Sequence, residues 1–284
     1  MCKVDISYWG YSVSLLKMLI DSIYYNVTCV ITQNGKYTDR FEEICLEANI
    51  PMISVNSREE LIKTCKTIYF SYVLVYCFGI IIPEELYQEK IIVNIHPGSL
   101  ETNRGAHSIL WSILIPDLGA EIAAYKICCN EIDSGELIAS VREVCEDDDN
   151  PIELVTKLEK NLPYIMGKIY EYFIEGNVKR PFIKGGVYRK RVTPEYYTLD
   201  IENDTKSIIK RKINSQSIYD GAILIESGER LRITGYVDKG AELVLIADDG
   251  SRKIIMFENE RIGKMDVKRD KISENIQTAS KVEV

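Results

Sequence analysis

The first 99 residues alternate short apolar runs with amphipathic segments, and this alternation constrains the fold more than any other feature of the chain. The runs that are typical of strands cover residues 3–10, 27–32, 51–55, 72–79 and 91–99. The segments with the apolar spacing of helices cover residues 12–25, 40–50, 58–68 and 83–90. Because the strand runs are nearly continuous in apolar residues, the pattern predicts a mainly parallel sheet with helices on both faces. Ligands of such sheets bind at the carboxyl ends of the strands.

The second half of the chain departs from this simple repeat. A helix over 107–117 and strands over 121–130 and after the turn at 132–135 are predicted first. The acidic run at 146–150 is typical of a solvated loop, and the long helical segment at 151–176 should be interrupted at Pro163. Beyond residue 184 the pattern indicates an irregular link, a short helix and four strand-like runs separated by Gly or Asp turns. We therefore predict an α/β domain over 1–188, a small mainly β subdomain over 189–264 and a polar tail over 265–284.

Composition narrows the class of protein. The chain has 284 residues, of which 46% are hydrophobic, which is enough for a sizeable core. No apolar run is long enough to cross a membrane, and an aspartate interrupts the start where a signal peptide would be apolar, so a cytoplasmic protein without membrane contact is expected. The net charge of −8 is concentrated before residue 184, which disfavours a nucleic-acid partner.

Two cofactor classes are disfavoured by the motifs that the chain lacks. The first predicted strand ends in a turn with only one glycine, Gly10, rather than the three of a dinucleotide-binding fingerprint. The eight cysteines show no CxxC pair and no Cys/His spacing suited to zinc, and they are interpreted as reduced core residues. No metal is expected.

The two histidines of the chain, His96 and His107, both lie between residues 93 and 107. His96 and Asn94 fall at the end of a predicted buried strand, where an amide and an imidazole could donate hydrogen bonds to an oxyanion developing on a carbonyl. Asp133 lies in an Asp-Ser-Gly turn that would leave its carboxylate at a strand end, ready to orient an imidazole. The three side chains together suit acyl transfer without a nucleophilic Ser or Cys, although spacing alone leaves structural roles open for each.

These motifs carry a family resemblance. The stretch NIHP at 94–97, the RG at 104–105 and IDSGELI at 132–138 resemble the signature of the folate-dependent formyltransferases. The resemblance covers roughly residues 1–190, and the tail more weakly resembles the C-terminal subdomain of methionyl-tRNA formyltransferases and sugar N-formyltransferases. It implies a Rossmann-like formyltransferase domain followed by a small OB-like subdomain.

The same resemblance implies the reaction and its residues. A formyl group would pass from the co-substrate 10-formyltetrahydrofolate to a primary amine. Asn94 and His96 would hold the oxyanion, His96 would also relay the proton of the amine, and Asp133 would orient His96. Contacts to the folate are expected from residues around the apolar turn and the two motifs: Phe78, Gly79, Ile81, Arg104 and Gly135. Arg104 also fits the role of a loop anchor, and His107 that of a capping or surface residue.

The acceptor is less constrained. Family members often read HPSLLP where this chain has HPGSLETNRG, so the acceptor of a relative does not transfer. The loop after the second predicted strand is short and lacks the long basic insertion of methionyl-tRNA formyltransferases, which argues against tRNA. A small amine, above all that of a nucleotide-linked amino sugar, is therefore favoured. Methionyl-tRNA, an amino acid or a carrier-bound amine stay open as acceptors, as do a homodimer and a folate-binding protein without catalysis.

Overall fold

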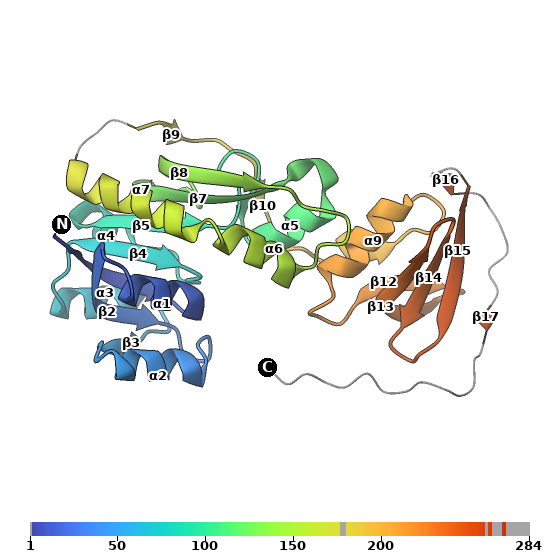
Figure 1. Cartoon of the computed structure of the whole chain (residues 1–284), viewed down its shortest axis with the longest axis horizontal. Coiled ribbons are helices and arrows are strands. Elements are labelled where there is room, and N and C mark those ends of the chain that lie inside the picture. Colours follow the sequence, from blue (N-terminus) through green and yellow to red (C-terminus); the bar gives the residue numbers. More distant parts are fainter. Residues whose placement is uncertain (1, 177–179, 259–260, 263–268, 271–284) are drawn as a thin grey trace. The chain divides into compact units, whose positions relative to one another are not determined.

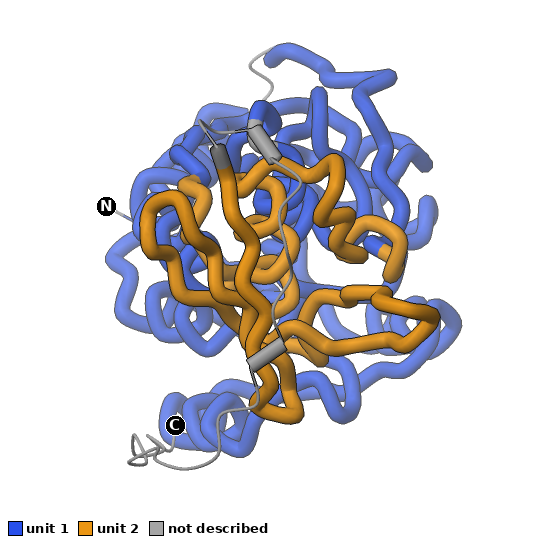
Figure 2. Tube along the Cα trace, turned by 90° about the vertical axis from the view of Figure 1, so that its right-hand side faces the viewer, with its two compact units in different colours: residues 1–145, 152–192 blue, residues 146–151, 193–284 orange. Residues whose placement is uncertain are grey.

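The computed structural model describes residues 2–176, 180–258, 261–262 and 269–270. The described chain divides into two compact units, coloured separately in Figure 2. Unit 1 comprises residues 1–145 and 152–192, and unit 2 comprises residues 146–151 and 193–284. The polar tail predicted over 265–284 lies outside the described residues apart from Arg269–Asp270.

Alternating strands and helices form the first unit (Figure 1). Its strands are β1 (Val4–Gly10), β2 (Tyr25–Thr32), β3 (Met52–Ser54), β4 (Tyr72–Tyr76), β5 (Ile91–His96), β6 (Arg104–Gly105), β7 (Ala120–Ile127), β8 (Gly135–Glu143), β9 (Phe182–Ile183) and β10 (Tyr188–Arg189). Its helices are α1 (Val13–Ile20), α2 (Asp39–Glu47), α3 (Arg58–Thr67), α4 (Glu84–Glu89), α5 (Ser108–Leu114), a 3-10 turn (Pro116–Leu118), α6 (Pro151–Glu159, whose first residue belongs to unit 2) and α7 (Leu162–Glu175).

The central sheet has the strand order β3-β2-β1-β4-β5-β7-β8-β9. The predicted Rossmann-like fold is confirmed, and pairing is parallel from β3 through β5. The remaining strands β7, β8 and β9 are antiparallel to their neighbours, which makes the sheet mixed. The turn between β7 and β8 spans only residues 128–134, too few for the crossover that a parallel pair needs.

Side-chain alternation along the strands feeds two cores. Leu74 and Val93 face the core that packs against α1, α2, α6 and α7. Val73, Val75 and Ile92 face the opposite core, against α3 and α4. Because successive strand residues point to opposite faces, a run that is apolar at every position is what a sheet covered on both sides requires.

Local signals set where the helices begin. Ser12, Thr38 and Ser57 are N-caps of α1, α2 and α3, and each side chain accepts a hydrogen bond from a backbone N–H of the first turn. Pro163 lies in the first turn of α7, where its missing N–H costs nothing. The predicted interruption at Pro163 is therefore confirmed as the break between α6 and α7. None of the described helices is both long and apolar enough to cross a membrane.

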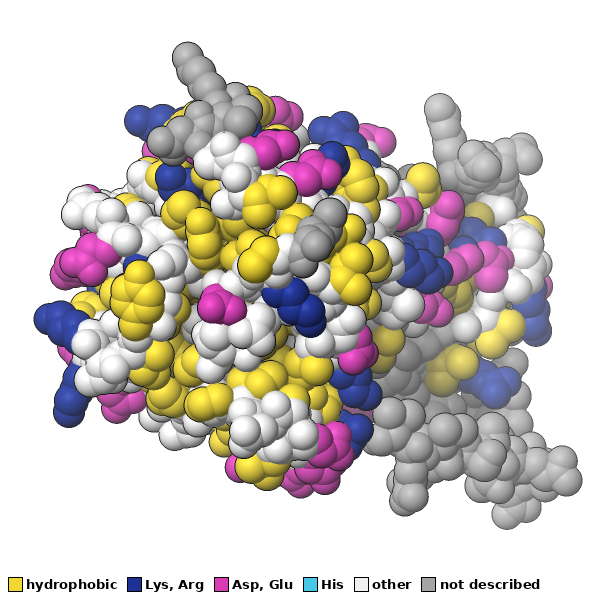
Figure 3. Space-filling model, turned by 60° about the vertical axis from the view of Figure 1, so that its left-hand side comes forward, with side chains coloured by type: hydrophobic (Ala, Val, Ile, Leu, Met, Phe, Trp, Pro, Cys, Tyr) yellow, Lys and Arg dark blue, Asp and Glu magenta, His cyan; other side chains and the backbone are white. Residues whose placement is uncertain are grey.

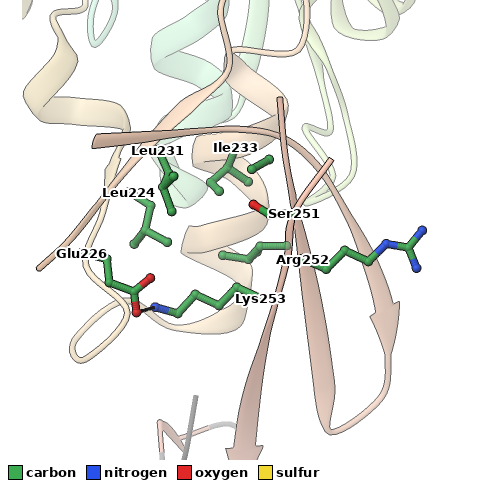
Figure 4. Close-up of a pocket in the computed structure, with 9 residues that line it drawn as sticks. Leu224, Glu226, Leu231, Ile233, Ser251, Arg252 and Lys253 are labelled. Atoms are coloured by element: carbon green, nitrogen blue, oxygen red, sulfur yellow. Dashed lines mark hydrogen bonds and ion pairs between the residues drawn. The ribbon is translucent and has the colours of Figure 1, made fainter. Parts of the chain in front are cut away.

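Unit 2 is the strand-rich part of the chain. It contains α8 (Pro194–Tyr197), α9 (Lys206–Ser215), β11 (Thr198–Leu199), β12 (Ala222–Glu226), β13 (Glu229–Lys239), β14 (Glu242–Ala247), β15 (Arg252–Glu258), β16 (Arg261–Ile262) and β17 (Arg269–Asp270). Strands β12 to β16 pair antiparallel in chain order. Figure 4 shows one edge of its core, where Lys253 and Glu226 form an ion pair of 2.7 Å beside Leu224 and Leu231. The void there has a volume of about 20 Å³, room for a single water molecule.

The acidic run at 146–150 is a loop, as expected, but it is only partly solvated: Glu146 and Asp148 are exposed, whereas its other acidic residues are not. Asp149 is only 5% exposed, and Asp147 accepts a 2.7 Å hydrogen bond from Nε of Arg211 on α9. Asp148 similarly accepts from the hydroxyl of Tyr236 at 2.7 Å. The run is polar because it binds basic and hydroxyl groups of unit 2, to which it belongs.

Hydrophobic side chains also reach the surface. On the face drawn in Figure 3 they lie in several groups separated by charged and polar side chains. Exposed examples in the chain include Ile23, Tyr69 and Ile174. Scattered exposure of this kind is ordinary for a folded protein and carries no argument for a partner.

Candidate functional site

The site is built on one face of β5. Asn94 and His96 are two residues apart and therefore share the face that carries Ile92 of the second core. Strand β7 pairs with β5 so that Tyr125 lies directly opposite Asn94. Side chains of directly opposed residues in an antiparallel pair lie on the same side of the sheet and touch. Strand geometry alone thus brings an amide, an imidazole and a phenol together.

Asp133 reaches this face from the turn between β7 and β8. Its backbone has a φ of 48°, in the left-handed region, and its carboxylate is bound at both oxygens. The backbone N–H of Gly105 donates to Oδ2 at 2.8 Å, and the hydroxyl of Tyr125 donates to Oδ1 at 2.9 Å. Nδ1 of His96 lies 3.5 Å from Oδ2. The structure therefore brings the three predicted catalytic residues, Asn94, His96 and Asp133, into one cluster.

The ring of His96 is held in a defined tautomer. Nε2 lies 2.9 Å from the backbone carbonyl of Asn103, and since a carbonyl only accepts, Nε2 carries a proton. Nδ1 is then the nitrogen that can gain or lose a proton, on the side of Asp133. The loop permits this contact because residue 98 is glycine: a Cβ there would lie 2.4 Å from Nε2 of His96. The unusual HPGSLETNRG loop therefore orients the imidazole.

A cavity of about 730 Å³ opens beside these residues, in the range of small-molecule sites. Asn94, His96 and Asp133 line it, as do Phe78, Gly79 and Ile81. Its apolar wall from residues 78–82 would suit a flat heteroaromatic ring, and its polar wall would lie at the reacting centre. The volume and the mixed lining are compatible with a folate co-substrate, whose pterin would lie against the apolar wall.

Two residues expected to contact the folate lie outside the set that lines this cavity. Arg104 is buried, and its guanidinium donates to Glu131 at 3.1 Å and to the carbonyl of Gly186 at 2.6 Å. That arrangement matches the alternative role of loop anchor. Gly135 begins β8 and has a φ of 156°, and a Cβ there would lie 2.1 Å from the carbonyl of Lys126. The glycine is needed for close strand pairing.

Other residues of the cavity wall had no motif to reveal them. His107 is the residue before α5, has a φ of 62°, and accepts at Nδ1 from the backbone N–H of Val192 at 3.2 Å. Burial, and then the charge of Arg191, lower its pKa. His107, Tyr188 and Arg191 all line the cavity. No ion pair of Arg191 is found among the residues that the structure describes, so its charge is available on the cavity wall.

The thiol of Cys77 on the cavity wall is not activated as a nucleophile. Cys77 lines the cavity, but burial, followed by the charge of Glu159, raises the pKa of its thiol to about 12. A thiol of that pKa stays protonated near neutral pH and is a weak nucleophile. Within the described residues, no group of three or more His, Cys, Asp or Glu side chains is arranged to hold a metal ion. Hydrogen bonding and proton relay are what the amide, imidazole and carboxylate of the cluster can provide chemically.

A second cavity, of about 600 Å³, lies within unit 2 between α9 and β13. Its two lysines are already paired: Lys206 with Asp238, and Lys210 with Asp148 at 2.7 Å. The carboxylates that line it are paired as well, Asp238 with Lys206 and Asp147 with Arg211. Because charges that are already paired offer little to a ligand, the cavity beside β5 is the better candidate.

No family model matches the chain. It is similar to a methionyl-tRNA formyltransferase of Coprothermobacter proteolyticus, with 25% identity over 233 residues that cover 76% of each protein.

Three solved structures share the fold. A 4-N formyltransferase from Francisella tularensis superposes with a TM-score of 0.67 at 15% identity, covering 84% of this chain and 99% of that one. WlaRD, a sugar 3N-formyl transferase solved with dTDP and 5-N-formyl-THF, gives 0.61 at 17% identity, covering 92% and 100%. HypX from Aquifex aeolicus, in complex with tetrahydrofolic acid, gives a TM-score of 0.61 at 15% identity. The match covers 90% of this chain but only 44% of HypX.

Proposed function

We propose, from the premise that the chain belongs to the folate-dependent formyltransferase family, that it moves a formyl group from 10-formyltetrahydrofolate to the primary amine of a small anionic acceptor. A nucleotide-linked amino sugar is the acceptor class that fits best. The observation that carries the reaction is the convergence of Asn94, His96 and Asp133 on one wall of the 730 Å³ cavity.

In this proposal the folate supplies a formyl carbon that the amine attacks, and the bond from that carbon to N10 breaks. The amide N–H of Asn94 stabilises the negative charge that develops on the formyl oxygen. Because Nε2 of His96 is bound to the carbonyl of Asn103, the proton of the amine passes through Nδ1. Asp133 stabilises the imidazolium, which then gives the proton to N10 as the bond from the formyl carbon to N10 breaks. The proposal therefore assigns the oxyanion to Asn94 and the proton transfer to His96.

The acceptor class rests on the other wall of the cavity. Arg191 carries a charge without an acidic partner among the described residues, and His107 offers a neutral ring beside it. An anion such as a diphosphate would bind this wall by charge-assisted hydrogen bonds. The link between β2 and α2 spans only residues 33–38, with Lys36 as its one basic residue, which leaves little to grip a tRNA acceptor stem.

Methionyl-tRNA is the second candidate acceptor, because the curated relative described above is a methionyl-tRNA formyltransferase by name. The two candidates differ in their dependence on salt. A tRNA substrate contacts many phosphates, so its binding should fall steeply with ionic strength. A small acceptor held by one or two cations should respond weakly.

The test is a screen for tetrahydrofolate release from 10-formyltetrahydrofolate with nucleotide-linked amino sugars, amino acids and methionyl-tRNA as acceptors, each at low and high salt. Formylation of one amino-sugar nucleotide with weak salt dependence is the expected result. Formylation of methionyl-tRNA alone would replace the acceptor and keep the reaction. Folate binding with no acceptor formylated would overturn the enzymatic assignment.

The anionic wall has its own matched test. Replacing Arg191 with Ala should raise the KM for the acceptor about five- to tenfold, the effect of one partly exposed charge-assisted hydrogen bond, and leave kcat nearly unchanged. Lys190→Ala removes the same charge one residue away, outside the cavity lining, and should leave both constants unchanged. Equal effects of the two variants would show that Arg191 attracts the acceptor by its charge in general and does not contact it directly.

A further inference from the structure

Tyr125 forms hydrogen bonds with two residues of the cluster, Asn94 and Asp133, and lies outside the motifs at 94–97, 104–105 and 132–138. It lies in the middle of β7, opposite Asn94 in the strand register, and is only 3% exposed. Its hydroxyl oxygen is 3.0 Å from Nδ2 of Asn94 and 2.9 Å from Oδ1 of Asp133. A single phenol therefore joins two predicted catalytic side chains that come from different elements.

Chemistry fixes the direction of both hydrogen bonds. An ionised carboxylate can only accept, so the one proton of the phenol goes to Asp133. The hydroxyl oxygen then has only lone pairs left, and it accepts from the NH₂ group of Asn94. Burial, and then the charge of Asp133, raise the pKa of Tyr125 well above its ordinary value, so the phenol keeps this proton.

We propose that Tyr125 is a positioning residue that sets the orientation of the Asn94 amide and the Asp133 carboxylate for formyl transfer. This inference rests on the proposed function. If the amide of Asn94 were flipped, its oxygen would face a hydroxyl oxygen whose proton is already given to Asp133. Tyr125 thereby holds the amide of Asn94 so that its NH₂ group, rather than its oxygen, faces the phenol hydroxyl. One of the two N–H bonds is used by Tyr125, and the other has no partner among the described residues.

The same hydroxyl limits the rotation of the Asp133 carboxylate. With Tyr125 on Oδ1 and the N–H of Gly105 on Oδ2, both oxygens of Asp133 are held, and the oxygen nearer His96 stays next to Nδ1. Loss of the phenol hydroxyl would free the amide to flip and the carboxylate to rotate, while the ring would still fill its space. Its removal should act on the reaction more than on the binding of either substrate.

The test compares Tyr125→Phe with Tyr25→Phe. Tyr25 on β2 is a matched control, because its ring is 1% exposed and its hydroxyl donates to the carbonyl of Met166 at 2.5 Å, in the core away from the cavity. Steady-state turnover with 10-formyltetrahydrofolate and the acceptor found in the screen gives kcat and both KM values. Thermal unfolding reports the stability of each variant, and binding of 5-formyltetrahydrofolate reports the folate site.

We expect Tyr125→Phe to lower kcat about 10- to 100-fold, the effect of losing a hydrogen bond to a charged group. Both KM values and the affinity for 5-formyltetrahydrofolate should stay within about twofold. Tyr25→Phe should lower Tm by a similar amount and leave kcat unchanged. In the Asn94→Ala background, Tyr125→Phe should cost much less than in the wild type, because part of its effect passes through Asn94.

The outcomes separate this inference from the function beneath it. If the wild type turns over and Tyr125→Phe keeps a wild-type kcat, the positioning role is refuted and the formyltransferase proposal stands. A fall in kcat that is matched by Tyr25→Phe, or that adds fully to Asn94→Ala, also refutes it. If the wild type binds folate and transfers no formyl group to any acceptor, both proposals fall together.

Discussion

Replacement of Asp133 by Asn tests the acid–base pair with little change in shape. The variant removes one negative charge and turns one carboxylate oxygen into an NH₂ group. That group would face either the N–H of Gly105 or the hydroxyl of Tyr125, which now contact the two oxygens. The hydroxyl can rotate whereas the backbone N–H cannot, so the NH₂ group should settle beside Tyr125. The loss in the free energy of unfolding should then be about 1 kcal/mol.

The effect on turnover should be larger. Asp133 and His96 are 12% and 7% exposed, and their nearest atoms are 3.5 Å apart. At an effective dielectric constant of about 20, a carboxylate at that distance attracts an imidazolium by roughly 5 kcal/mol. Part of this is lost to the response of surrounding dipoles and water. We therefore expect kcat to fall about 100- to 1,000-fold, because the imidazolium forms only as the amine loses its proton.

The assay follows tetrahydrofolate release spectrophotometrically and folate affinity by titration with 5-formyltetrahydrofolate. The exposed carboxylate of Asp5, which accepts from Asn26 at 2.8 Å, provides a control in Asp5→Asn, for which kcat should be unchanged. A kcat for Asp133→Asn within about threefold of the wild type would refute the account of the pair. Equal losses in folate affinity and kcat would reduce Asp133 to a turn residue.

Three further predictions concern the surroundings of the site. Gly98→Ala should lower kcat and cost about 1–3 kcal/mol in the free energy of unfolding, because its methyl group would lie 2.4 Å from Nε2 of His96; wild-type turnover would argue against this contact. Arg104→Met should cost about 2–3 kcal/mol by denaturant unfolding, since it removes an anchor that binds a carboxylate and a carbonyl 2.6 Å away; an unchanged midpoint would contradict the anchoring role. Burial and a neighbouring arginine lower the pKa of His107 in the folded protein. As pH falls through the ordinary value of 6.5, the unfolded chain therefore binds a proton before the folded protein does, and the free energy of unfolding decreases. His107→Gln should flatten the fall of Tm between pH 7 and 5, and an unchanged slope would mean that His107 does not contribute.

Much of unit 1 could be predicted because its signals are local. The continuous apolar strands follow from a sheet that is buried on both faces, as the split of Val73 and Leu74 between the two cores shows. Asn94 and His96 could be placed on one face because strand side chains alternate with a period of two. Asp133 could be placed near them because a short turn precedes the next strand.

The features that escaped prediction depend on contacts between distant residues. Tyr125 lies eight positions before Asp133 on a predicted strand, so its face could have been derived, but its partner depends on the pairing of β7 with β5. The carbonyl of Asn103 contacts His96 only because the loop after β5 folds back. The acidic run at 146–150 looked solvated because its partner, Arg211, lies more than sixty residues away. Side-chain chemistry was readable from the sequence, whereas the identity of each partner was not.

The most direct test of the central claim follows the formyl carbon itself. The folate would carry a ¹³C-labelled formyl group, and ¹³C NMR would record the label with the acceptor found in the screen, for the wild type and Asp133→Asn. The account predicts that the label moves to a new formamide in the wild type and moves about 100- to 1,000-fold more slowly in the variant. Label appearing as free formate at the same rate in both would contradict it, because the cluster would then neither select the amine nor drive the transfer.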